Sequence, residues 1–410
     1  MTHRHLAGAR ILAQGLVPPS VSEPSTSAAV SSSGTEERTA SSTSTAAYPT
    51  PAQVAHGFAA HQGQDLSGVV SSLALRSGGD AAAVLTAFDR GEIVRGYPMR
   101  GTVFATSAAT LPWLTQLCAG APVRAAIKRR SSLGLTDEHV GRAGEILEEL
   151  AVPASTPGVG RGVTRAELFA AWEAAGVPTR GGCGYHLLVH HISTGTACYG
   201  PWRDGDTAVV HAPTWLPSGS DLEGTFHGDE HAALAELALR YFTSHGPASV
   251  RDLAWWSKLP MGRITAALAE ASDRLESGWA DAQGRLHADP AKAVASRGET
   301  LYWRPGLAEE YAAREKETMR ELLLPGFDEL VLGYQDRLYL MDDERHARLV
   351  PGNNGVFKRT AVRRGEVVGI WSRAGTGSRR RFVLDPVTPI SPTQTSRFET
   401  LFARFPYPSD

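Results

Sequence analysis

Hydrophobic positions recur at helical spacing from residue 51 onward. Pro51 suits a first helical turn, and Val54 and Phe58 lie four residues apart. Asp65 is a predicted N-cap for a second helix. The apolar face of that helix consists of Leu66, Val69, Val70, Leu73 and Leu75. Residues 93–106 then predict two short strands around a turn, and residues 111–114 open another helix. Helices followed by a two-stranded hairpin are typical of a winged-helix unit.

The same order recurs twice along the chain. Thr164 and Glu167 have the spacing of a capping box, and residues 185–191 predict the next helix. Strands at 197–202 and 208–211 around a polar turn then form a second hairpin. A third unit starts with a helix from His231, continues with a helix capped at Ser249, and includes a helix through residues 264–275. From about residue 325, alternating apolar and polar residues predict strands at 338–340, 356–357, 367–371 and 381–384.

These patterns predict a mainly α fold with small β-hairpins, in the α+β class. We expect tandem winged-helix units followed by a C-terminal antiparallel β subdomain. The expected boundaries are 1–115, 116–225, 226–320 and 321–410. Residues 18–50 are rich in Ser, Thr, Ala and Pro, with almost no large apolar residue, and are expected to be a disordered insert within the first unit.

Composition narrows the class of protein. The chain has 410 residues, 20% of them charged, and a formal net charge of −2. Its three cysteines, Cys118, Cys183 and Cys198, are scattered, which argues against a disulfide framework or a zinc site and favours a reducing cytoplasm. No apolar run approaches the roughly 20 residues that span a bilayer, and no secretory signal is evident. We expect a cytoplasmic, nucleoid-associated monomer without a cofactor, a metal or a membrane partner.

Positive charge is concentrated near the C-terminus. Between Phe357 and Arg381 the sequence holds a single acid, Glu366, and eight basic residues: Lys358, Arg359, Arg363, Arg364, Arg373, Arg379, Arg380 and Arg381. A cationic sheet in a nearly neutral protein favours a phosphate-facing surface. A second cluster, Arg124 with residues 128–130, lies on a predicted helix and fits a solvated face equally well.

Common catalytic motifs are absent. The sequence has no GxSxG elbow, phosphate-binding loop or HExxH motif. His186 and His190 have the spacing of metal ligands on a helix, but no third ligand accompanies them, so a core or DNA-facing role is favoured. Gln62 and Gln64 flank Gly63 at a predicted helix end, where both amides can turn to one side. On composition alone, a polar loop between helices with a helix cap is the favoured interpretation of this segment.

Several segments together resemble the AlkZ/YcaQ-type bacterial DNA glycosylases. The first half contributes Gln62-Gly63-Gln64-Asp65-Leu66, Pro98-Met99-Arg100-Gly101-Thr102, Leu111-Pro112-Trp113 and Thr164-Arg165-Ala166-Glu167-Leu168. The second half contributes Arg240-Tyr241-Phe242, Gly246-Pro247-Ala248, Asp252 with Trp255-Trp256, Leu324-Pro325-Gly326-Phe327-Asp328-Glu329, Gly333-Tyr334 with Asp336-Arg337, and Asn354-Gly355-Val356-Phe357. These segments cover nearly the whole chain outside residues 18–50.

The resemblance implies tandem winged helices around duplex DNA and a catalytic Gln-x-Gln motif, which maps to Gln62 and Gln64. This motif places the chain with the AlkZ-like branch, whose members resemble self-resistance proteins of genotoxin producers. Gly63 departs from the larger apolar residue usual at that position. We expect the DNA-binding residues to be Arg100, Arg337, Asn354, Lys358, Arg359, Arg379, Arg380 and Arg381.

The expected activity is hydrolysis of the N-glycosidic bond of alkylated bases, N7-alkylguanine above all, with bulky adducts or interstrand crosslinks as further substrates. The product would be an abasic site, in DNA repair or self-resistance to a DNA-alkylating natural product. The alternative is a winged-helix DNA-binding protein without catalysis, either a transcriptional regulator or a damage sensor. The absence of a long heptad segment for dimerisation counts against a regulator.

Overall fold

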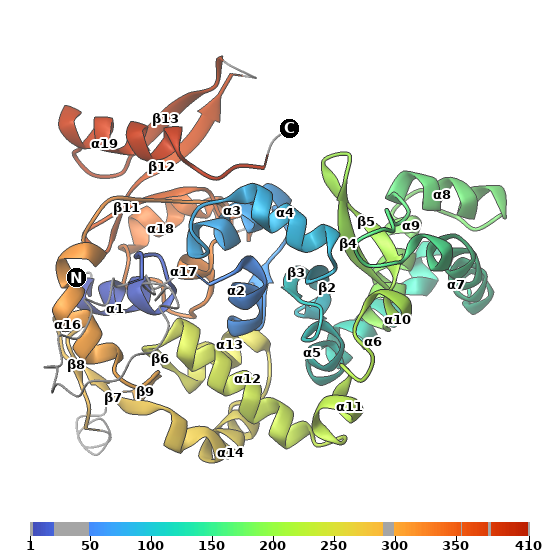
Figure 1. The fold of residues 1–410 in the computed structure, drawn as a ribbon, viewed down its shortest axis with the longest axis horizontal. Helices are drawn as coiled ribbons and strands as arrows, with labels where there is room; N and C mark the ends of the chain where they lie inside the picture. The colour runs from blue at the N-terminus through green and yellow to red at the C-terminus, as the bar shows by residue number, and fades with distance from the viewer. Residues whose placement is uncertain (1–2, 20–48, 290–298, 354, 376–378, 409–410) are drawn as a thin grey trace, which may run out of the picture.

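The structure is a computed structural model that describes residues 3–19, 49–289, 299–353, 355–375 and 379–408. Most of the insert predicted over residues 18–50 lies outside the described residues. Within these residues, helices pack against three antiparallel sheets (Figure 1). The predicted α+β class is therefore confirmed.

The first unit follows the predicted order. α2 (Pro51–Gly57) begins at a capping box of Thr50 and Gln53, and the Asp65 side chain caps α3 (Leu66–Arg76). α4 (Ala81–Asp89) leads into the hairpin of β2 (Ile93–Met99) and β3 (Thr102–Ser107). Between α2 and α3 the chain forms a short strand that the periodicity did not predict, β1 (His61–Gln62), which pairs antiparallel with β3.

One sheet joins the hairpins of the first two units. Its order is β1-β3-β2-β4-β5, with β4 (Ala197–Arg203) and β5 (Asp206–His211) from the second hairpin, and Arg95 pairs with Tyr199 across the junction. α5 (Leu111–Cys118), α6 (Gly120–Arg129) and α7 (Asp137–Ala151) connect the two hairpins. α8 (Arg165–Ala174) and α9 (Cys183–Ser193) lie where the sequence predicted helices. The sheet thus crosses the expected boundary at residue 115.

The third unit contains α12 (Glu230–His245), α13 (Val250–Ser257) and α14 (Met261–Ala271). Its sheet has the order β6-β9-β7-β8, from β6 (Ala248–Ser249), β9 (Leu301–Trp303), β7 (Glu276–Ala280) and β8 (Leu286–His287). α1 (Arg4–Ala13) lies within the expected first unit by sequence. In the structure it packs against α12 and α16 (Leu307–Thr318), which are more than 200 residues away along the chain. Residues 3–17 therefore belong spatially with the third unit.

The C-terminal part contains the predicted antiparallel sheet with different members. Its order is β10-β11-β12-β13, formed by β10 (Leu322–Leu324), β11 (Thr360–Arg363), β12 (Glu366–Ala374) and β13 (Arg381–Pro386). α19 (Pro392–Ala403) covers it, with Phe398 buried in the same cluster as Trp371. The β12–β13 hairpin extends at the edge of the molecule (Figure 1).

Two predicted strands are wrong. Residues 338–340 form a turn between α17 (Glu329–Leu332) and α18 (Asp343–Leu349), and residues 356–357 lie in a loop. Tyr339 and Leu340 are buried in the main core instead, where the Tyr339 hydroxyl donates to the carbonyl of Leu330. Their apolar character reflects burial of a loop, which alternation alone does not distinguish from a strand.

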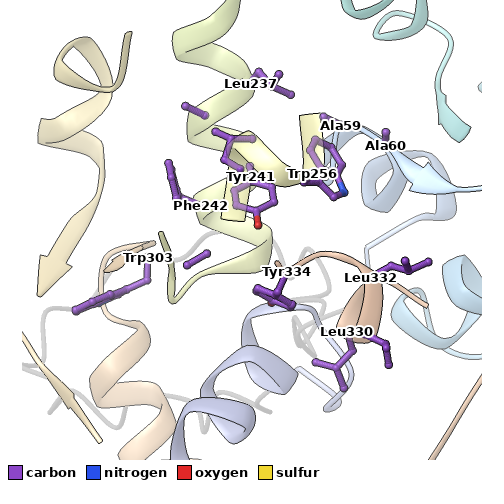
Figure 2. Packing of buried hydrophobic residues seen from close by; sticks show 14 of the residues in the cluster. Ala59, Ala60, Leu237, Tyr241, Phe242, Trp256, Trp303, Leu330, Leu332 and Tyr334 are labelled. Carbon is purple, nitrogen blue, oxygen red and sulfur yellow. The ribbon is translucent and has the colours of Figure 1, made fainter. Parts of the chain in front are cut away.

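The main core lies where α12, α13 and residues 330–334 meet. Tyr241, Phe242, Trp256 and Tyr334 are fully buried there, and Ala59 and Ala60, just before β1, belong to the same cluster (Figure 2). The three cysteines, Cys118, Cys183 and Cys198, are free and buried. The first and third units therefore share one core, and β1 starts at its edge.

A buried ion pair fastens α3 to the C-terminal part. Arg76 and Asp328 are 1% and 0% exposed, and two guanidinium nitrogens each donate to a carboxylate oxygen at 2.9 Å. Burial alone would raise the pKa of Asp328, but the Arg76 guanidinium and neighbouring donors hold this pKa below its ordinary value. Because the folded-state pKa is depressed, the stabilisation is present above about pH 4 and is lost as the pH falls further.

We predict that Asp328→Asn lowers the free energy of unfolding by about 3–5 kcal/mol, because it leaves the buried Arg76 without its counter-charge. Urea unfolding checks this value. The control is Arg142→Gln, which removes an ion pair to Glu145 whose side chains are 50% and 68% exposed, and should change stability by less than about 0.5 kcal/mol. Equal effects of the two substitutions would contradict the structural role of the buried pair.

Candidate active site

The Gln-x-Gln motif lies on β1 and the turn that follows it, rather than at the helix end expected from the sequence. α2 ends at Gly57, and the chain then extends along β3, with Gln62 paired to Phe104. Side chains of directly paired residues lie on the same face of a sheet, so Gln62 and Phe104 share a face. Extension of the chain, and not a broken helix, determines where the two amides point.

Three hydrogen bonds fix the backbone of the motif. The Gly63 amide donates to the carbonyl of Val103 at 2.8 Å, and Arg95 donates from Nη2 to the Gly63 carbonyl at 2.9 Å. The Gln62 amide donates to Oε1 of Glu329 at 2.8 Å. The backbone of the motif is therefore held by β3, by β2 and by the start of α17, three elements that are far apart in the sequence.

The two glutamine side chains differ in environment. Gln62 is 5% exposed, and its Oε1 accepts a hydrogen bond from the Gly63 amide at 2.9 Å. Gln64 is exposed on the turn before α3. The Gln62 side chain is thus held in place by the protein, whereas the Gln64 side chain is accessible to solvent and to a bound ligand.

The structure explains why residue 63 is a glycine. An added Cβ would lie 3.2 Å from the amide nitrogen of Ala105 and from the carbonyl carbon of Phe104. Both atoms belong to the backbone of β3 and cannot move as freely as the end of a flexible side chain. The larger residue usual in the resembling family would therefore push β1 away from β3 here.

Glu329 organises the polar groups behind β1. Its side chain is 1% exposed, and besides Gln62 it accepts from Nε1 of Trp256 at 3.1 Å and contacts Nε2 of His245 at 3.4 Å. His61 is also buried, and burial, Arg76 and His245 lower its pKa far below the ordinary value, so the imidazole stays neutral. These groups support the motif from within the core.

The predicted DNA-binding residues fall into two groups. Arg100 and Arg337 come together at the ring of Trp255, with their Cζ atoms 5.1 Å and 4.6 Å from its centroid. The others belong to the C-terminal sheet and its approach, apart from the first hairpin (Figure 1). Lys358, Arg379 and Arg381 are exposed, Arg380 is half-buried, and Arg359 lies between the rings of Trp371 and Tyr407. Asn354 lies outside the described residues.

Among the other candidates from the sequence, Arg130 and His190 are partners of each other. Arg130 donates to the ring of His190 at 3.0 Å and to Asp137 at 3.0 Å, which ties α9 to the start of α7. Among the residues that the structure describes, no group of three or more His, Cys, Asp or Glu side chains could hold a metal ion. In the same residues no helix has the length and apolarity to cross a membrane.

Sequence reasoning missed four residues around the motif: Arg95, Trp255, Lys258 and Glu329. Trp255 and Glu329 belong to segments that carry the family resemblance, but nothing in their spacing assigned them a role. Arg95 gave no signal, because its partner Gly63 is 32 residues away, and nothing in the sequence indicated that Lys258 lies over the Trp255 ring.

We predict that Gly63→Ala lowers the free energy of unfolding by about 1–3 kcal/mol, because the new methyl group presses on the β3 backbone. Chemical denaturation measures this change. Gly57→Ala is the matched control, since an added Cβ there meets nothing within 4 Å and alanine favours the helix, so stability should stay equal or rise. A Gly63→Ala variant as stable as the Gly57→Ala variant would refute the close approach.

Comparisons with known proteins agree with this arrangement. A family model described as DNA glycosylase AlkZ-like matches residues 56–406. Among solved structures, the Streptomyces sahachiroi DNA glycosylase AlkZ has a similar fold, with a TM-score of 0.65 and 18% sequence identity. The match covers 100% of this chain and 98% of that chain. A search of curated proteins gives no match. Because the family model spans most of the chain and includes the polar motif on β1, this chain belongs to the AlkZ-like family of DNA glycosylases.

Proposed function

We propose that the protein hydrolyses the N-glycosidic bond of alkylated bases in duplex DNA and leaves an abasic site. The observation that carries this proposal is the pair Gln62 and Gln64 on a backbone fixed by Val103, Arg95 and Glu329. The resemblance assigns catalysis to these two amides, and a fixed backbone gives them the preorganisation that dipoles need to stabilise a developing charge.

The chemistry of an amide restricts the reaction. A neutral amide is a poor general base and cannot remove a proton from water ahead of attack. The bond to the base must therefore break in a dissociative step, with a leaving group that departs without a general acid. N7-alkylguanine meets this requirement, since it is positively charged while attached and leaves as a neutral base.

The two glutamines then have different roles. The sugar develops oxocarbenium character as the base departs, as in other glycoside hydrolyses. We assign to Gln62 the presentation of its carbonyl dipole to this cation, and to the exposed Gln64 the orientation of the water that attacks the anomeric carbon. In the described structure Gln62 Oε1 is bonded to the Gly63 amide, so the Gln62 side chain would change partner when DNA binds.

The wider setting of the proposal is duplex DNA contacted by a monomer in the bacterial cytoplasm, at the nucleoid. Four units, divided near residues 115, 225 and 320, would surround the duplex, with the first two sharing a sheet. Simple N7-methylguanine and bulky or crosslinked N7-guanine adducts are both compatible with a leaving group of this kind. A motif that reaches the sugar in place would suit adducts that are too large to be extruded into a pocket.

We predict that Gln62→Ala and Gln64→Ala each lower the rate of base release by about 10²–10³-fold, as loss of a preorganised transition-state contact does. The assay uses duplex DNA with N7-methylguanine, and a second duplex with a bulky N7-guanine adduct, followed by strand scission at abasic sites. Binding of the same duplexes should change little, because the two amides carry no net charge.

The outcomes separate the candidate functions. Release from the wild-type protein that both variants lose supports the proposal. If the wild-type protein binds duplex DNA in a salt-dependent manner but releases neither base, the chain is a winged-helix DNA-binding protein or damage sensor. If the variants lose binding and release together, the two glutamines have a structural role.

A further inference from the structure

Three cations converge on one indole ring beside the motif. The Cζ atoms of Arg100 and Arg337 and the Nζ atom of Lys258 lie 5.1, 4.6 and 4.9 Å from the ring centroid of Trp255. Any two of them are therefore within about 10 Å, a separation over which charges still interact at moderate ionic strength. Arg100 comes from the β2–β3 turn, Lys258 from the end of α13, and Arg337 from the loop after α17.

This group has no paired carboxylate among the described residues, although the charges of Glu329 and Asp336 act on Arg100 and Arg337. Within the described parts of the chain, none of the three cations forms an ion pair with a carboxylate. The nearest acids are otherwise engaged: Glu329 accepts from Gln62 and Trp256, and Asp336 accepts from the Leu338 amide. After desolvation, the charges of Arg100 and Arg337 are what lower the pKa of Lys258. The free protein thus carries mutual repulsion at this place that a bound anion would relieve.

Two of the three cations occupy backbone positions that favour glycine or asparagine. Arg100 has a φ of 60° and is followed by Gly101 with a φ of 68°, which is a hairpin turn with both central residues in the left-handed region. Lys258 has a φ of 61° at the C-cap of α13. Long cationic side chains at such positions have a conformational cost, and strained backbone of this kind is concentrated at functional sites.

The three cations lie beside the sheet face that carries Gln62. The Arg100 guanidinium lies 5.7 Å from the ring centroid of Phe104, the residue that pairs with Gln62. Gln62 and Phe104 share a face of the sheet, so the cations border the face that carries the motif. Lys258 is exposed, and Arg100 and Arg337 are partly exposed, so solvent reaches the cluster.

We propose that Arg100, Lys258 and Arg337 form a single phosphate-binding site that holds one backbone phosphate of the DNA strand beside the nucleotide at Gln62. Guanidinium and ammonium groups are the donors that bind phosphate most strongly, and phosphate contacts set the register of a protein on duplex DNA. The proposal rests on the proposed function for the identity of the strand. The anion site itself follows from the three cations alone.

The first test uses inorganic phosphate and requires no DNA. Melting temperature is measured in phosphate and in chloride at equal pH and ionic strength. The wild-type protein should melt at a higher temperature in phosphate, because an anion that binds only the folded state stabilises it. Lys258→Gln, an exposed position, should keep or raise the melting temperature in chloride and lose the gain in phosphate. Arg142→Gln on α7 should behave as the wild type.

The second test measures binding of undamaged duplex DNA as a function of salt. The slope of log Kobs against log salt should fall in magnitude by about 0.9 in Lys258→Gln, in Arg337→Gln and in the triple Arg100→Gln/Lys258→Gln/Arg337→Gln variant alike, because one phosphate is lost in each case. A triple variant that loses about three times as much would overturn the single site in favour of three separate phosphate contacts. An unchanged slope, or an equal phosphate gain in wild type and Lys258→Gln, would overturn the site altogether.

These outcomes are distinguishable from failure of the proposed function. If the wild-type protein releases no base but shows the phosphate gain and the slope change, the glycosylase proposal fails and the phosphate site stands. If base release is found but neither measurement responds to the substitutions, the activity stands and the phosphate site fails.

Discussion

Two consecutive buried acids connect the parts of this protein. Asp328 is bound by Arg76 and Ser72 of α3, and Glu329 receives the Gln62 amide, Nε1 of Trp256 and the His245 ring. Their carboxylates point to different elements, so one dipeptide fixes α3, β1 and α13 relative to one another. An uncompensated charge at this depth is costly, so each carboxylate strongly favours the one arrangement that supplies all its donors. The position of the Gln-x-Gln backbone depends on that arrangement.

Local sequence signals predicted much of the fold. Capping residues at Asp65, Thr164 and Ser249 each begin a helix as expected, because a cap needs only neighbours in sequence. Both predicted wings are hairpins. The wrong predictions concern contacts between residues distant in sequence. β1 has only two residues and forms by pairing with β3. Tyr339 and Leu340 have the apolar pattern of a strand but lie in a buried loop. Neither the pairing of β1 nor the burial of this loop produces a distinctive periodicity of apolar residues in the sequence.

The candidate site shows the same division. Family resemblance predicted roles for Gln62, Gln64, Arg100 and Arg337, but the residues that surround them in the fold could not be predicted from the sequence. Arg95 and Glu329 reach the motif across at least 32 residues of sequence, and Lys258 contacts the ring of Trp255. Gly63 was an unexplained departure in the sequence, and the spacing between β1 and β3 gives its reason. Candidate residues could be predicted from the sequence where their type alone suggests a role. Their contacts could not, because these form only when distant segments come together in the fold.

The buried cysteines have a consequence for a protein that would work among electrophiles. The reactive form of cysteine is the thiolate, and an alkylating compound must both reach the sulfur and find it deprotonated. Cys118, Cys183 and Cys198 are at most 8% exposed, and burial raises the pKa of Cys118 to about 12 and also raises that of Cys198. These three thiols are therefore poorly accessible to alkylating compounds. Such a protein would keep its cysteines unmodified in the presence of these reagents.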